Sequence, residues 1–389
     1  MRPRRARSGP GVACSLAGLV VLAMTFEVVR LDAVLTEGQR LAAVYDTILQ
    51  AKFSRARDML RTTCPPAPLE ACRAVSAAAS WWEILIDPNN RALDGKFEKE
   101  AQAAIDAAAA WTKREPKRAE AWFYLAGSYA PLTQWQALRG KNVAAARNGN
   151  RIRSALEKAI ELDPTLVDAY FGIGMYHYWA DVAPAAAKLL RMLLFLPGGD
   201  RKKGLEEMLK ARREGVLLAG EADFQLHWLY LWFEHDTAKA LELVRSLDAR
   251  YPTNPVFLQR IAEIEHDYRH DHRASAQAWE ELMTRSSRRE IEFASLAEAR
   301  ARLGLAQELI EDSQAARALS ILDVLAPTTT APYGALSVAE FLRGEAYTRL
   351  QQRDRAAAAY ARAIDRAPGD DPYDIRRRSR DAIKKNARP

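Results

Sequence analysis

Apolar residues recur at helical spacing along this chain of 389 residues, and the clearest stretch runs from 337 to 370. Small and apolar residues fall on one face of each of two segments, which predicts two helices joined by a polar turn at 351–354. Pro368 ends the second helix because proline cannot continue one. The sequence has no strand-like alternation of useful length, so we expect an all-α fold.

The helix pair from 337 to 370 resembles the tetratricopeptide repeat (TPR), a unit of 34 residues. The resemblance rests on the family's signature positions, which are here Gly344, Tyr347, Ala356, Tyr360, Ala363 and Pro368. Weaker units precede this one as far back as residue 119. The resemblance implies an α-solenoid of TPR-like antiparallel helix pairs, whose stacking buries a continuous core.

The pattern also sets domain boundaries. Residues 31–118 form degenerate N-terminal helix pairs, 119–370 the TPR-like solenoid, and 371–389 a basic C-terminal capping helix or tail. An insertion at 179–203, after the second clear repeat, carries its own apolar helix. We expect that helix to pack into the solenoid, to project over the groove as a lid or partner-binding helix, or to lie on a membrane surface.

A narrower stretch, 172–205, is similar to the central region of Iml2/TTC39-type TPR proteins. The similarity rests on Gly172, Gly174, Pro184, Lys188, Leu189, Leu190, Leu194, Gly199, Asp200, Arg201, Gly204 and Leu205. It implies a TPR fold for this stretch and no biochemical role.

The N-terminus predicts export. A basic segment at 2–7 is followed by an uncharged, largely apolar run at 11–26, which is short for a membrane span and typical of a signal peptide. Residues 1–30 are therefore expected to be a signal peptide or an uncleaved signal anchor, with a possible membrane tether through 11–29. The expected location is the periplasm or cell envelope. A basic tail without a targeting role is the alternative.

The net charge argues against a nucleic-acid partner. The formal charge is +7, and residues 1–30 contribute five arginines and one glutamate, or +4. The difference, 7 − 4 = +3, belongs to residues 31–389 and is small and dispersed.

Two cysteines agree with export. Cys64 and Cys72 bracket a turn with three prolines, and a disulfide closing these nine residues would contribute ~2.5 kcal/mol on the chain-entropy model. Two buried thiols flanking a helix hairpin are the alternative.

The chain shows no catalytic motif, so we expect no enzyme, no catalytic residue and no cofactor. A histidine-rich cluster at 266–272 is the one candidate for metal chemistry, because His266 and His270 are four residues apart and could share a helical face, with Asp271 and His272 as further ligands. The repeat alignment places this cluster at a turn, and Arg269 and Arg273 would repel a cation. A hydrated turn without a metal is the preferred interpretation.

The TPR resemblance also implies a partner-binding groove, lined by the inner face of the first helix of each unit. Carried over residue by residue, these positions are Phe123, Phe171, Met175, Tyr178, Gln225, Trp232, Gln259, Glu263 and His266. Such a surface suits an extended peptide or a helix, although packing against the next repeat is as compatible with each residue. We therefore predict an exported interaction scaffold with a protein or peptide partner and no catalysis. The alternative is a small-molecule- or metal-binding accessory protein of the cell envelope that uses a pocket beside the insertion helix. The pattern does not predict an oligomeric state.

Overall fold

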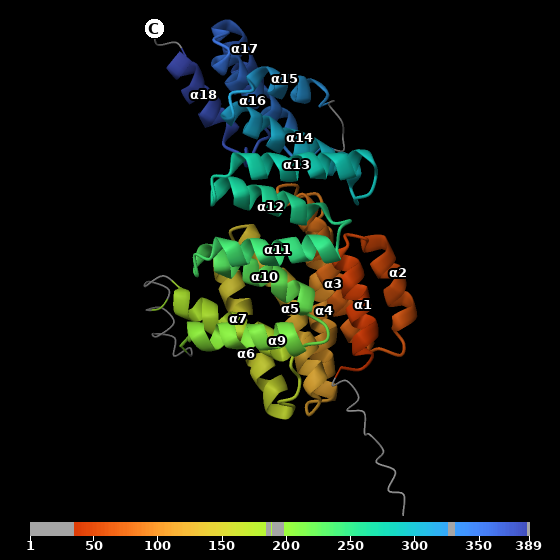
Figure 1. Cartoon of the computed structure of the whole chain (residues 1–389). Coiled ribbons are helices and arrows are strands. Elements are labelled where there is room, and N and C mark those ends of the chain that lie inside the picture. Colours follow the sequence, from red (N-terminus) through yellow and green to blue (C-terminus); the bar gives the residue numbers. More distant parts are fainter. Residues whose placement is uncertain (1–34, 184–187, 189–197, 326–330, 387–389) are drawn as a thin grey trace, which may run out of the picture. The chain divides into compact units, whose positions relative to one another are not determined.

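The computed structural model describes residues 35–183, 188, 198–325 and 331–386, and these contain helices and no strands (Figure 1). The predicted signal segment and most of the insertion helix lie outside these ranges. The helices are α1 (Gly38–Leu49), α2 (Phe53–Thr63), α3 (Leu69–Ile86), α4 (Asp94–Arg114), α5 (Ala119–Leu138), α6 (Asn142–Leu162), α7 (Ala169–Val182), α9 (Arg201–Glu214), α10 (Ala219–Trp232), α11 (Thr237–Arg250), α12 (Pro255–Asp267), α13 (His272–Ser287), α14 (Ala294–Glu311), α15 (Ala315–Asp323), α16 (Ala335–Arg349), α17 (Arg353–Arg366) and α18 (Ile375–Asn386).

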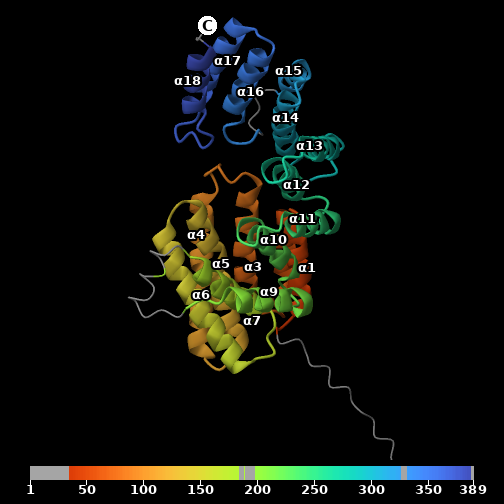
Figure 2. The ribbon, with the colours of Figure 1, turned by 60° about the vertical axis from the view of Figure 1, so that its left-hand side comes forward.

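Consecutive helices pack as pairs, and the first helices of neighbouring pairs also touch, as α12, α14 and α16 do (Figures 1 and 2). The all-α prediction and the TPR-like pairing are confirmed. The last pair shows why the signature residues matter. A Cβ on Gly344 of α16 would lie 2.5 Å from the Tyr360 ring of α17, so glycine is what allows this ring to lie against the helix.

The pairs share one kind of turn. A residue with left-handed backbone precedes the second helix of several pairs: Ala51, Gly140, His235, His270, Ser313 and Gln351, with φ between 51° and 72°. The chemistry of these side chains differs, whereas the conformation does not. The repeat is therefore maintained in the turns by backbone geometry, which makes it hard to see in the sequence.

The N-terminal helices contact more than their sequence neighbours. Tyr251 donates to Asp46 at 2.6 Å, and Asn254 donates to the Leu49 carbonyl oxygen at 2.9 Å. Arg300, on α14, pairs with Asp87 at the end of α3 at 3.0 Å. The degenerate pairs thus pack on later units, instead of touching only the unit that follows them. Trp82 of α3 also packs on Phe224 of α10, with ring centroids 4.7 Å apart, and both helices contribute to the walls of the site described below.

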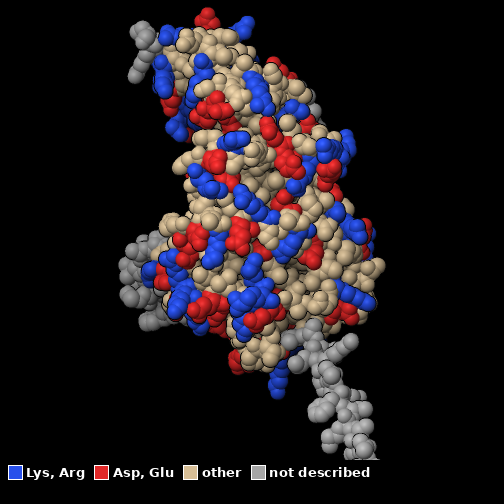
Figure 3. Space-filling model, in the orientation of Figure 1, with Lys and Arg blue, Asp and Glu red and all other residues tan. Residues whose placement is uncertain are grey.

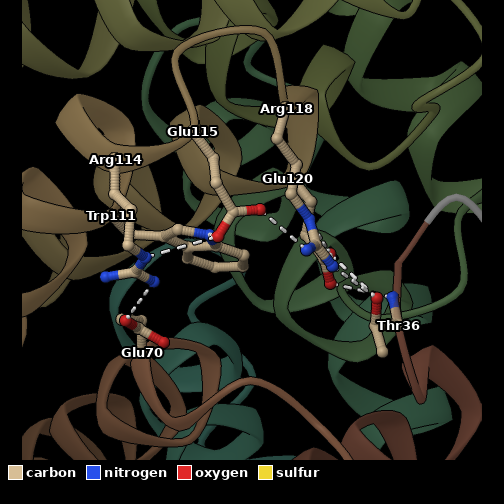
Figure 4. A network of polar contacts seen from close by, with 7 residues as sticks. All are labelled: Thr36, Glu70, Trp111, Arg114, Glu115, Arg118 and Glu120. Atoms are coloured by element: carbon tan, nitrogen blue, oxygen red, sulfur yellow. Dashed lines mark hydrogen bonds and ion pairs between the residues drawn. The ribbon is translucent and has the colours of Figure 1, made fainter.

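A polar network joins the first described residues to the turn between α4 and α5 (Figure 4). Glu120 accepts hydrogen bonds from the Thr36 amide at 2.8 Å and from Arg118 at 2.7 Å. Arg118 also lies over the Trp111 ring, at 5.1 Å from the centroid. The buried Glu120 carboxylate therefore has a cationic partner, as a buried charge requires.

Further features concern the chain ends and surface. Cys64 and Cys72 form a disulfide between the end of α2 and the start of α3, with Cα atoms 6.5 Å apart.

The basic C-terminal segment includes α18, which packs on α16 and α17 and buries Ile375. Basic and acidic side chains are interspersed over the face seen in Figure 3. No helix within the described ranges combines the length and the apolar character that a membrane span needs.

Candidate functional site

A cavity of about 580 Å³ lies among α3, α5, α6, α7 and α10. Its walls are mostly apolar and include Val75, Phe123, Ile152, Phe171 and Met175. This volume is within the range of ligand pockets, about 300–1,000 Å³. It is also roughly four times an engineered cavity of about 150 Å³ that holds benzene. The cavity is therefore large enough for a substantial apolar ligand.

Small residues on two adjacent helices create this space. Gly127 and Ala130 of α5 and Ala145, Ala146 and Gly149 of α6 line it. A Cβ added to Gly127 or Gly149 would meet no atom within 4 Å. Larger side chains at these positions would fill the cavity, so its volume is set by the choice of small residues.

Three lining residues of the cavity are exposed, Ala137, Ala146 and Trp179. They come from α5, α6 and α7 respectively. The cavity therefore reaches the surface of the protein.

The cavity wall also contains a buried carboxylate, that of Glu221 on α10. Its Oε2 accepts hydrogen bonds from the Tyr45 hydroxyl and the Trp82 indole, both at 3.0 Å, and its Oε1 accepts one from the Gln225 amide at 2.7 Å. Burial raises the pKa of Glu221 above its ordinary value, although these donors lower it in part. Because Tyr45, Glu221 and Gln225 all line the cavity, one part of an apolar wall is polar.

A second carboxylate on the wall, Asp168, has a structural role. It accepts hydrogen bonds from three consecutive backbone amides, Val216 at 2.9 Å, Leu217 at 2.9 Å and Leu218 at 3.0 Å. These amides belong to the loop between α9 and α10, and two of their residues line the cavity. Asp168 therefore holds this loop in place, and its oxygens are engaged.

The predicted groove residues separate into two groups. Phe123, Phe171, Met175 and Gln225 line the cavity. Tyr178 packs in the core instead: its side chain is fully buried, and its hydroxyl donates to Glu234 at 2.6 Å. Burial, together with this contact to Glu234, raises the pKa of Tyr178.

The remaining predicted residues lie on α10 and α12, outside the cavity lining. Trp232 is 44% exposed, stacks on Trp228 and donates to the Tyr268 hydroxyl at 3.0 Å. Gln259 donates to Glu263 at 2.7 Å and accepts from Arg300 at 2.8 Å. The cavity therefore does not form one continuous groove through all the predicted positions.

The histidine cluster is arranged differently from the predicted pair. His270 lies in the turn after α12, with a φ of 52°, so it does not share a helical face with His266. His266 and His272 instead contact Glu308, at 2.8 and 2.9 Å, each through Nδ1 and each on a different carboxylate oxygen. The three ligand atoms lie within 4.8 Å of one another. The His272 contact is a hydrogen bond, so a metal ion at these three atoms would have to replace it.

Glu308 was not among the predicted residues. It lies on α14, 36 positions beyond His272 in the sequence, and only the packing of α13 on α14 brings it to the histidines. No spacing in the sequence links Glu308 to the histidines, so the sequence did not indicate it.

The sequence matches no family model and no curated protein sequence. Solved structures with similar folds are those of TPR-repeat proteins. The Cut9–Hcn1 hetero-tetramer of APC/C shares 13% identity with a TM-score of 0.40, over 86% of this chain and 59% of that chain. Human IFIT1 with m7Gppp-AAAA shares 14% identity with a TM-score of 0.42, over 86% and 69%. Yeast Tom70 shares 14% identity with a TM-score of 0.38, over 80% and 64%. This chain thus spans less than two thirds of the Cut9–Hcn1 and Tom70 chains.

Proposed function

We propose that this protein is an exported, non-catalytic binding protein that holds an apolar segment of a partner protein in the cavity among α3, α5, α6, α7 and α10. The observation that carries the proposal is the cavity itself, which is mostly apolar, reaches the surface and is lined by residues from six helices, with Tyr45 of α1 as the sixth contribution. Apolar side chains that leave water for such a site gain about 25 cal/mol per Å² of buried surface.

A protein segment suits the surface side of the cavity because two of its exposed lining residues are small. These are Ala137 and Ala146, and Trp179 is a third exposed lining residue, at 37%. A partner's backbone can approach alanines closely, and an exposed tryptophan is a common anchor of protein interfaces. The backbone of the bound segment would lie at the surface while its apolar side chains occupy the cavity.

Two observations support export. The segment at 2–26 has the basic and apolar parts of a signal sequence. The Cys64–Cys72 disulfide is of the kind that persists in oxidising compartments. Intact-mass analysis tests the route: a mass beginning near Met24 supports cleavage, and retention of Met1 supports an anchor.

The binding proposal is tested by photo-crosslinking in the native compartment, with a benzophenone side chain placed at Ala137. Gly149→Leu should fill the cavity, and it should also favour the helix, since glycine costs roughly 1 kcal/mol there relative to a good helix former. We expect a crosslinked protein that is lost in Gly149→Leu. Gly95→Leu, where an added Cβ also meets no atom, is the matched control outside the cavity. A crosslink that survives the filled cavity would refute the proposal.

A small amphiphilic molecule is the second candidate ligand. It is favoured by the polar group at Glu221, which gives an otherwise apolar wall one distinct attachment point. Native mass spectrometry of protein purified from its own compartment distinguishes the two, because a retained small molecule would add a discrete mass that Gly149→Leu removes.

A further inference from the structure

The cavity has an unusual charge balance. Among the described residues, its lining includes the carboxylates Glu221 and Asp168 but no lysine, arginine or histidine. Asp168 is engaged by three backbone amides. Glu221 is therefore the one lining carboxylate, within the described part of the chain, that is left to face a ligand.

Glu221 differs from the other buried glutamates. Glu120 and Glu265 pair with arginines, at 2.7 Å in both cases. Glu340 pairs with Arg362 at 2.8 Å, and Glu308 contacts two histidines. Within the described ranges Glu221 has neutral partners alone, a tyrosine, a tryptophan and two glutamines. A buried carboxylate without a cation is costly, so a cationic partner from outside the chain would complete this site.

The hydrogen-bond partners on one side of Glu221 are amide side chains that a stronger donor can replace. Oε1 accepts from Gln225, and Gln134 is a further hydrogen-bond partner of Glu221 that also contacts Gln225. An ammonium group brings three N–H donors and no acceptor, so it can take the place of an amide donor at the carboxylate and donate to the amide oxygens beside it.

The rest of the wall suits the chain that carries the charge. Aromatic rings, among them Tyr45, Phe123 and Phe171, line the cavity beside apolar side chains. Aromatic faces attract cations, and apolar walls accept methylene groups. A carboxylate or phosphate would meet Glu221 without any cation to hold it.

We propose that the occupant of the cavity presents an alkylammonium group to Glu221, and that a lysine side chain in the partner's apolar segment supplies it. This inference rests on the proposed function and names the chemistry of the segment. A lysine offers a stem of four methylene groups for the apolar wall and a charged end for the carboxylate.

The test uses three probes of one chain length, n-octylammonium, octan-1-ol and octanoate, titrated into the full-length protein by calorimetry at pH 7. We expect octylammonium to bind at least tenfold more tightly than octan-1-ol, and octanoate to bind most weakly. Glu221→Gln should lose the preference for the amine and retain octan-1-ol, which also shows that the variant is folded. Glu242→Gln, an exposed carboxylate on α11 that removes the same charge, should keep the preference.

The outcomes separate the two proposals. Equal binding of the amine and the alcohol, or a preference that persists in Glu221→Gln, would overturn the ammonium inference while leaving the apolar cavity. Failure of all three probes to bind would overturn the proposed function as well. A leucine-rich peptide with one lysine, compared with the same peptide carrying norleucine at that position, tests whether a lysine supplies the ammonium group. Equal binding of the two peptides, together with a clear preference for octylammonium, would refute the lysine assignment in favour of a free amine.

Discussion

Removing the Asp168 carboxylate should destabilise the protein strongly, because three backbone amides depend on it. The Leu217 amide is buried and would be left without an acceptor, at a cost of about 2 kcal/mol. The amides of Val216 and Leu218 are partly buried, so each would lose about 1 kcal/mol as water replaces the carboxylate. Asp168→Ala should therefore lower the free energy of unfolding by about 4 kcal/mol, a large share of the 5–15 kcal/mol typical of proteins.

Asp168→Asn refines this prediction. Oδ1 accepts from Leu217 and Leu218, whereas Oδ2 accepts from Val216 alone. An asparagine can keep the first two contacts, but its NH₂ group would then face the third amide. We expect a loss of about 2 kcal/mol, half that of the alanine variant.

Urea unfolding followed by circular dichroism measures both variants. Asp163→Ala is the matched control. This half-buried aspartate also accepts a backbone hydrogen bond, from Thr165 at 2.9 Å, but that bond is exposed to solvent, so its loss should cost no more than about 1 kcal/mol. A loss in Asp168→Ala no larger than in this control would refute the reasoning, because it would show that water satisfies the three amides fully.

Three further predictions concern other parts of the chain. Gln351→Gly should raise the free energy of unfolding by about 0.5–1 kcal/mol, since it relieves a left-handed backbone, and a lower urea midpoint would contradict this. Replacing Cys64 and Cys72 by serine together should lower it by ~2.5 kcal/mol, whereas an unchanged midpoint would show that the disulfide does not restrict the unfolded chain. The raised pKa of Glu221 means that the folded state binds more protons than the unfolded state above about pH 4.5, so stability is lost as pH rises toward the folded pKa. The free energy of unfolding of the wild type, relative to that of Glu221→Gln, should decline from pH 4 to 7. A rise with pH would contradict this and indicate a cationic group close to Glu221.

The fold was predictable from the sequence where the small and apolar signature residues of the repeat lie on one face of each helix. Gly344 and Tyr360 fall on signature positions and contact each other in the structure. The cavity was only partly predictable, because α5 and α10 bury residues on most of their surface, and a helix that is apolar all round does not reveal which side faces a ligand. Tyr178 illustrates the limit: it occupies a predicted groove position and lies in the core.

The polar part of the site depends on contacts that sequence spacing does not show. Trp82 and Glu221 are 139 residues apart, and no motif links them. Glu308 joins the histidines for the same reason, through helix packing in space. The sequence could not show that Glu221 lacks a cationic partner, because that requires the partners of the other charged residues to be known.

The return of the N-terminal helices onto later units has a consequence for the order of folding. A simple solenoid forms contacts between neighbours and can fold from any point along its length. Here Asn254 bonds the Leu49 carbonyl oxygen across 205 residues, and the Tyr333 amide bonds Asp87 across 246. Such distant contacts slow folding, because a long loop must close before they form. The helices before residue 118 can pack on one another early, whereas their contacts to later units and the cavity wall from α10 form only once more than half of the chain has folded.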